Sequence, residues 1–92
     1  LGPKGILVNV ARGSVVDEAV LLRYLQEKKI AGAGLDVFEH EPSVPPGFYA
    51  LDNAVLYPHV ASATLETRKA MGDLQVENLH LFFAGKPVKT PV

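Results

Sequence analysis

Hydrophobic residues gather in three short runs along the chain, separated by polar and glycine-rich stretches. The first run, residues 6–10, carries no charge and ends just before Gly13, which predicts a fully buried strand of a parallel sheet. Runs at residues 35–38 and 54–57 predict a second and a third strand, and Pro58 ends the third. We therefore expect the chain to contribute three strands to one sheet.

Apolar positions spaced three and four residues apart predict a helix between the first two strands. Asp17 is a good N-cap, and Glu18 puts negative charge into the first turn, where the helix dipole favours it. The pattern is carried by the apolar Val20, Leu21, Tyr24 and Leu25 and ends at Lys28 and Lys29. This predicts an amphipathic helix of about three turns.

A second, longer helical pattern occupies residues 65–83. Thr64 is its predicted N-cap, and Gly85 and Pro87 end it. At a rise of 1.5 Å per residue such a helix is about 30 Å long. The residues expected on one side of it are Met71, Leu74, Asn78, Leu81 and Phe82. An extended tail follows.

Residues 39–53 contain Pro42, Pro45, Pro46 and Gly47 and predict a long irregular loop, of a length that in compact domains is functional or disordered. The pair Gly32-x-Gly34 resembles a dinucleotide loop only superficially. A phosphate-binding loop follows a strand and opens a helix, whereas these glycines follow a helix and open a strand.

The order of strand, helix, strand, loop, strand and helix predicts parallel strands joined by right-handed crossovers. The fold class is therefore α/β, a partial doubly wound parallel sheet of Rossmann-like type with three strands and two helices. Such a sheet is incomplete by itself, and the chain opens without a methionine. We therefore expect it to be a fragment of a larger two-domain protein.

Composition narrows the function classes. The net charge is −1, and the nine basic residues are scattered, so neither nucleic acid nor an anionic membrane is an expected partner. The chain has no cysteine, which excludes disulfides and thiolate metal sites and is compatible with the cytoplasm. We find no signal-peptide pattern and no apolar run long enough to cross a bilayer.

Polar residues of four kinds stand at or just beyond the carboxyl ends of the predicted strands: Arg12, Asp36, Glu41 and His59. In an open parallel sheet this is the edge where ligands bind. An arginine there can hold a carboxylate or phosphate with its planar fork of donors. Together the four side chains predict an acid–base set in which a histidine pairs with a carboxylate beside an anion-binding arginine.

Each of these residues also has a purely structural interpretation. Arg12 could pair with a structural carboxylate, Asp36 could cap a turn, and Glu41 could be solvated, while His59 could be a hydrogen-bonded structural histidine. The remaining histidines, His40 and His80, have no partner at metal-ligand spacing, so we expect no metal site.

Several motifs together resemble the D-isomer-specific 2-hydroxyacid dehydrogenases, in the C-terminal part of their NAD(P)-binding domain. They are Leu7-Val8-Asn9-Val10-Ala11-Arg12-Gly13, Val16-Asp17, Ala31-Gly32-Ala33-Gly34-Leu35-Asp36-Val37-Phe38, Glu41-Pro42 and Pro58-His59 with Thr64. The resemblance covers essentially the whole chain. The sequences of Glu39-His40-Glu41-Pro42 and of residues 58–64 are most similar to those of the glyoxylate/hydroxypyruvate reductase branch.

The resemblance implies a role for each matching residue. Arg12 would bind the substrate carboxylate, His59 would donate the proton in reduction, and Glu41 would orient His59 and favour its charged form. Asp36 matches the family position that meets the nicotinamide carboxamide. The other residues that match cofactor-lining positions are Val10, Ala11, Val60, Ala61 and Ser62, with Arg12 and His59 beside them.

The resemblance further implies a domain division: residues 1–64 in the cofactor domain, 65–84 in a helix leading back to the substrate domain, and 85–92 in a tail. It implies NADP or NAD as cofactor, with NADPH favoured by the branch, a small 2-oxo or 2-hydroxy acid as substrate, and a homodimer as the full-length protein. Two alternatives stay open: a non-catalytic, corepressor-like protein that senses the nucleotide on the same fold, and a fragment without activity of its own.

Overall fold

The computed structural model describes all residues from 1 to 92, and it divides into two compact units, Leu1–Ala61 and Ser62–Val92. The first unit holds strands β1 (Ile6–Asn9), β2 (Gly32–Leu35) and β3 (Ala54–Leu56) with helix α1 (Glu18–Gln26). The second unit consists of helix α2 (Leu65–Phe83) and the tail that follows it.

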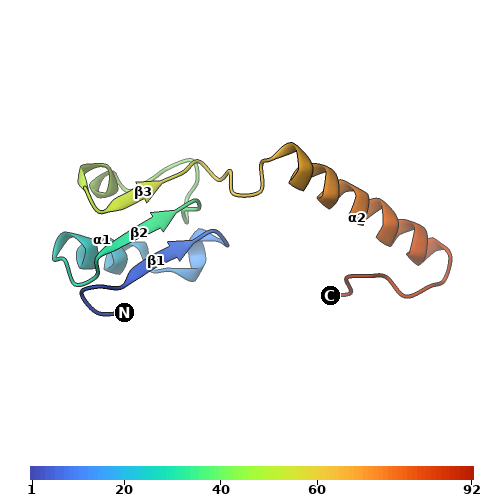
Figure 1. The fold of residues 1–92 in the computed structure, drawn as a ribbon, viewed down its shortest axis with the longest axis horizontal. Helices are drawn as coiled ribbons and strands as arrows, with labels where there is room; N and C mark the ends of the chain where they lie inside the picture. Colours follow the sequence, from blue (N-terminus) through green and yellow to red (C-terminus); the bar gives the residue numbers. More distant parts are fainter. The chain divides into compact units, whose positions relative to one another are not determined.

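The three strands form one parallel sheet in the order β1-β2-β3 (Figure 1). In the β1–β2 pair Ile6 lies opposite Gly32, and in the β2–β3 pair Leu35 lies opposite Leu56. The predicted α/β class and parallel sheet are confirmed. Because the strands are parallel, their carboxyl ends meet at one edge.

Strand β2 lies three residues earlier than the sequence pattern predicts, at Gly32–Leu35 instead of 35–38. Gly32 pairs with Ile6 and Gly34 with Val8, which makes both glycines part of the strand. A Cβ on Gly32 would lie 2.9 Å from the carbonyl oxygen of Asn53, so this position has no room for a side chain. The rejection of a phosphate-binding loop at Gly32 and Gly34 is thereby confirmed. Asp36 consequently stands just beyond the strand.

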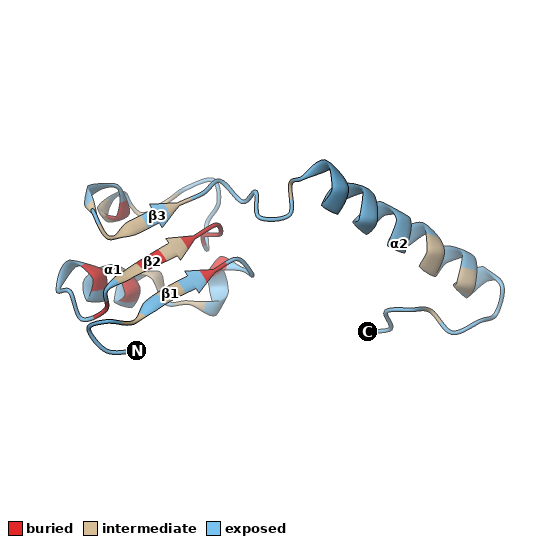
Figure 2. Ribbon diagram, viewed as in Figure 1, coloured by how far each residue is buried: buried red, intermediate tan, exposed pale blue.

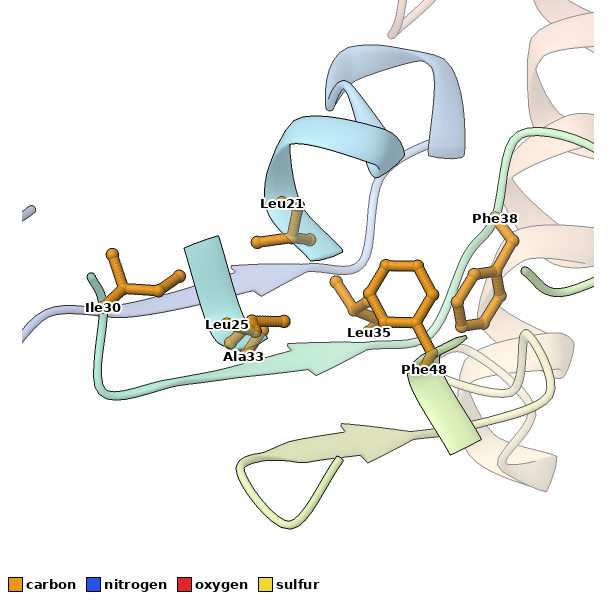
Figure 3. Packing of buried hydrophobic residues seen from close by; sticks show 7 residues of the cluster. All are labelled: Leu21, Leu25, Ile30, Ala33, Leu35, Phe38 and Phe48. Atoms are coloured by element: carbon orange, nitrogen blue, oxygen red, sulfur yellow. The ribbon is translucent and has the colours of Figure 1, made fainter. Parts of the chain in front are cut away.

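The core lies on the side of the sheet that carries α1 (Figure 3). Leu21 and Leu25 of α1 pack with Leu35 of β2, and Phe38 meets Phe48 edge to face at 6.1 Å between ring centroids. Each such side chain contributes about 1.5–3 kcal/mol by leaving water. Because Phe38 and Phe48 belong to the loop after β2, this core holds that loop against the sheet.

The expectation that the first strand is buried on both faces is wrong. Ile6 and Val8 of β1 are exposed, whereas Asn9 is buried, so only one face of the sheet is covered (Figure 2). Within the first unit no helix covers that side, so the side chains that point there are exposed. The apolar run predicted the strand correctly but not its surroundings.

Helix α1 begins as predicted, with the Asp17 side chain accepting a hydrogen bond from the Val20 amide. It ends at Gln26, two residues before the predicted lysine pair, because Lys28 takes the left-handed conformation at φ 54°. The long loop after β2 contains a short 3-10 turn at Pro46–Ala50, which carries the buried Phe48. The loop is therefore ordered by its own core residue.

Helix α2 has the predicted bounds, Leu65–Phe83, and the predicted N-cap, Thr64, which accepts from the Thr67 amide. Its apolar residues are not confined to one side, however, and none of its residues is buried within this unit (Figure 2). Asn78 ties the tail to the helix through hydrogen bonds with the Thr90 hydroxyl and the Lys89 amide. Neither helix combines the length and hydropathy that crossing a membrane requires.

Candidate active site

Arg12, Glu41 and His59 line a single hollow of about 250 Å³ at the carboxyl edge of the sheet. Arg12 follows β1 and His59 follows β3, while Glu41 belongs to the loop after β2. Three separate segments therefore bring a guanidinium, a carboxylate and an imidazole to one place. The convergence expected from the strand ends is present in the structure.

The His59 and Glu41 side chains are hydrogen-bonded to each other. His59 Nδ1 donates to Glu41 Oε2 over 2.7 Å, and the His59 side chain is 47% exposed. With Nδ1 engaged by the carboxylate, Nε2 is the ring nitrogen left for exchange of a proton with a ligand. The geometry is that of an oriented general acid.

Glu41 is itself held by a second hydrogen bond. Its Oε1 accepts from the backbone amide of Phe38 at 2.9 Å, so both carboxylate oxygens have fixed partners. The hydrogen bond from His59, followed by that from Phe38, holds the pKa of Glu41 below its ordinary value. Glu41 is therefore an anion at neutral pH, held 2.7 Å from Nδ1 of the ring.

Asp36 contacts the segment after His59 rather than its ring. Its Oδ1 accepts from the Val60 amide at 2.8 Å and its Oδ2 from the Ala61 amide at 2.9 Å. The Val60 bond is the main cause that lowers the pKa of Asp36, and burial opposes it. Asp36 is thus an ionised carboxylate built into the edge of the sheet.

Asn9, which the sequence analysis did not single out as a site residue, braces the loop that carries Arg12. Its side-chain amide donates to the Arg12 carbonyl at 2.9 Å, and its Oδ1 accepts from the Ala11 amide at 3.1 Å. A buried asparagine at the end of an apolar strand is the signal that could have revealed it.

Gly13 allows the Arg12 loop to lie against the loop after β2. A Cβ at this position would sit 2.0 Å from the carbonyl carbon of Phe38. The same stretch is fixed from α1, because Glu18 accepts a hydrogen bond from the Glu39 amide at 2.6 Å. Glu18, predicted only as a favourable first-turn residue, thus also holds a wall of the hollow.

The residues expected to meet a cofactor divide between the two units. Val10, Ala11, Val60 and Ala61 lie beside the sheet edge in the first unit, where Val10 and Val60 expose apolar surface. Ser62 belongs to the second unit.

These groups fit the nicotinamide end of a dinucleotide. The exposed valines offer apolar surface to a planar ring, and the Asp36 carboxylate has acceptor sites beyond the two that the backbone amides occupy. Asp36 also lines a second hollow of about 350 Å³, which lies against the His59–Glu41 pair. A carboxamide N–H group can therefore find an acceptor here.

Residues 1–61 match the family described as the NAD binding domain of D-isomer specific 2-hydroxyacid dehydrogenase. The matched stretch contains Arg12, Asp36, Glu41 and His59.

Curated relatives match over the whole chain. It is 58% identical to hydroxyphenylpyruvate reductase of Plectranthus scutellarioides and 60% identical to 2-ketogluconate reductase of Gluconobacter oxydans, in each case over 92 residues. It is 54% identical to glyoxylate/hydroxypyruvate reductase A of Arabidopsis thaliana over the same length. The chain spans 29–30% of the length of these relatives.

Solved structures agree with this grouping. An NADPH-dependent glyoxylate/hydroxypyruvate reductase from Sinorhizobium meliloti, in complex with NADP and malonate, superposes with a TM-score of 0.88 at 57% identity. The match covers 99% of this chain and 28% of that one. The resemblance inferred from the motifs is confirmed: the chain belongs to the D-isomer specific 2-hydroxyacid dehydrogenase family.

Proposed function

We propose that this chain is the C-terminal part of the cofactor domain of an enzyme that reduces a small 2-oxo acid, such as glyoxylate or hydroxypyruvate, to the D-2-hydroxy acid with NADPH or NADH. The observation that carries the proposal is the hollow shared by Arg12, Glu41 and His59, with its 2.7 Å hydrogen bond between the last two. Reduction of a 2-oxo acid needs an anion holder and an oriented proton donor, and this set supplies both.

Arg12 holds the substrate carboxylate in this proposal, and His59 gives the proton from Nε2 to the carbonyl oxygen. Glu41 keeps the ring oriented through Nδ1 and stabilises its positive charge before the proton leaves. The guanidinium beside the carbonyl also polarises it, for which the planar fork of arginine is better suited than the point charge of lysine.

The bound nicotinamide would supply the hydride. Asp36 would accept from its carboxamide, while Val10, Ala11, Val60, Ala61 and Ser62 would line it, with Arg12 and His59 facing the substrate. The NADP bound to the Sinorhizobium meliloti relative supports NADPH rather than NADH as the cofactor.

We also propose the domain division given by the resemblance: residues 1–64 with the cofactor, 65–84 as the helix leading to the substrate domain, and 85–92 as its tail. Apolar residues all round α2 support burial on more than one side in a longer protein. A cytoplasmic homodimer completes the proposal, for which the cysteine-free sequence and the family resemblance are the support. Sedimentation of the full-length protein tests the dimer.

Steady-state turnover of the full-length protein tests the function. Oxidation of NADPH and NADH is followed at 340 nm with glyoxylate, hydroxypyruvate and a larger 2-oxo acid. We expect turnover with at least one of these acids and formation of the D-hydroxy acid. A full-length protein that binds NADPH and turns over none of them would overturn the proposal in favour of a nucleotide-sensing protein of the same fold.

A further inference from the structure

His59 has a backbone conformation that its own side chain does not favour. Its φ of 59° lies in the left-handed region, which is uncommon for residues other than glycine because their Cβ approaches the following carbonyl oxygen. The ring is half exposed, so packing around the imidazole does not hold the residue in this conformation. The restraint has to come from the backbone on either side.

Asp36 supplies such a restraint. Its two carboxylate oxygens bind the amides of Val60 and Ala61, the two residues that directly follow His59. Two bonds to consecutive amides fix the orientation of the peptide leaving His59, and not only its position. Asp36 is itself tied to the sheet, because its amide donates to the Asn9 carbonyl at 3.0 Å.

The sheet thus holds His59 at two points. Asp36 fixes the backbone that leaves the residue, and Glu41 fixes the ring through Nδ1. Both carboxylates stand within six positions of the end of β2. If the peptide after His59 turned, the direction of its Cα–Cβ bond would change and the ring would leave Glu41.

We propose that Asp36 is a positioning residue for His59, whose carboxylate clamps the Val60 and Ala61 amides so that the imidazole meets Glu41. This role rests on the proposed function and is additional to any contact of Asp36 with a cofactor. It requires a carboxylate, because an asparagine would turn an N–H group towards one of the two donors. The lowered pKa of Asp36 agrees with a carboxylate that stays ionised at neutral pH.

The experiment follows the His59 ring by NMR during a pH titration of the full-length protein without cofactor or substrate. The charged groups that face the ring or its hollow are Asp36, Glu41, Arg12 and Glu39. Four proteins are compared: unaltered, Asp36→Asn, Glu41→Gln and the double variant. The readout is the pH at the midpoint of the ring titration.

If Asp36 acts through the Glu41 pairing, Asp36→Asn lowers the midpoint of the ring titration in the same direction as Glu41→Gln, and by no more than that variant does. The double variant then lies no lower than Glu41→Gln alone, because the two changes remove one interaction. An equal downward shift in both backgrounds would mean that Asp36 acts by charge alone, and no shift would mean that it does not act on His59. Either outcome overturns the clamp.

Asp17→Asn is the matched control, because Asp17 is also a carboxylate that accepts from a backbone amide, but it caps α1. It should leave the His59 midpoint unchanged. If Asp36→Asn fails to fold by circular dichroism, Asp36→Ser replaces it, since a hydroxyl keeps at most one of the two bonds without opposing the amides. The same non-additivity with Glu41→Gln is then expected.

This readout does not depend on turnover. Loss of the expected coupling in a protein that reduces 2-oxo acids overturns the clamp and leaves the proposed function standing. Absence of turnover in the unaltered protein overturns the proposed function, and the coupling between Asp36 and Glu41 can still be measured.

Discussion

The loops that carry Arg12 and His59 leave the same edge of the sheet but restrain their side chains to different degrees. Asn9 fixes the backbone around Arg12, while the guanidinium bonds only to the neighbouring Ala11 carbonyl, at 2.6 Å. In the His59 loop both the backbone and the ring are held, by Asp36 and Glu41. The Arg12 side chain is thus held only by the carbonyl next to it, whereas the His59 ring is oriented by a residue of another loop.

This difference matches the tasks proposed for the two residues. A guanidinium that binds an anion can adjust to it, because charge attraction and a fork of donors tolerate small shifts. Proton transfer depends on a short, aligned contact between the donor and the carbonyl oxygen, so a mobile imidazole would transfer its proton more slowly. The comparison leads to five predictions for the full-length protein, from the largest effect to the smallest.

Removing the oriented group should have the largest effect. His59→Ala should lower kcat for 2-oxo acid reduction by about 10²–10⁴-fold, because general acid catalysis is lost. The half-exposed ring contributes little packing, so circular dichroism and the melting temperature should stay close to those of the unaltered protein. His80→Ala, an exposed histidine of α2, is the control and should keep full turnover. Normal kcat in His59→Ala would exclude it as the acid.

Replacing Arg12 should have the next largest effect. Arg12→Lys keeps the charge and loses the fork, so kcat/KM for the 2-oxo acid should fall by about 100-fold. Arg23→Lys is the control, because Arg23 lies on α1 over the Tyr24 ring, 5.8 Å from its centroid. Equal losses in the two variants would show that the effect is not specific to the hollow.

Neutralising the partner of His59 should change the pH dependence more than the rate. The pKa of Glu41 is lowered by the hydrogen bond from His59, so this carboxylate is an anion beside the ring at neutral pH. In Glu41→Gln the rate of reduction should therefore decline at lower pH than in the unaltered protein, with kcat reduced about tenfold. Glu27→Gln, which breaks an exposed pair with Lys29, should leave the profile in place. A profile unchanged by Glu41→Gln would contradict the pairing.

Loosening the Arg12 loop should affect binding rather than the chemical step. Asn9→Ala removes both bonds to the loop and should raise KM for the 2-oxo acid about tenfold, with kcat nearly constant. Asn53→Ala is the matched control, since Asn53 donates to the Leu25 carbonyl at 3.1 Å away from the hollow. Both variants should lose about 1–3 kcal/mol of stability, but only the first should raise KM.

The smallest effect concerns stability in acid. Because the pKa values of Asp36 and Glu41 are lowered in the folded state, both carboxylates stabilise the fold above their ordinary values of 3.8 and 4.5. That stabilisation is lost as the pH falls through the lower folded values. Glu41→Gln should therefore flatten the decline of melting temperature below about pH 4.5, as measured by differential scanning fluorimetry. An equally steep decline would show that Glu41 does not contribute.

The sequence predicted which residues would stand at the sheet edge but not what holds them there. Arg12 and His59 follow β1 and β3 directly, so parallel topology predicts that they stand at the same edge. Glu41 lies six residues beyond β2, so its place also depends on the conformation of the loop. The contact of Asp36 with the Val60 and Ala61 amides depends on the conformation of a loop after β3, which no periodicity encodes. The bracing by Asn9 is hidden in the same way.

The boundaries of β2 show the same limit. Propensity favours residues 35–38, which include Val37 and Phe38, over a glycine-rich stretch, yet the strand runs over Gly32–Leu35. This stretch pairs with both neighbouring strands, and the Asn53 backbone approaches Gly32 closely. Both are tertiary contacts, which the local sequence does not reveal. The burial of β1 was predicted wrongly for a related reason, because an apolar run does not reveal how many layers cover it.

The uncovered face of the sheet affects how the 92 residues behave when prepared alone. Ile6 and Val8 of β1 and Val55 of β3 flank Gly32 and Gly34 of β2, and all three side chains are exposed. This face of the sheet is therefore a broad apolar surface in contact with solvent. Surfaces of this kind adhere to one another as protein concentration rises. Prepared as a separate polypeptide, these 92 residues should precipitate or oligomerise without specificity.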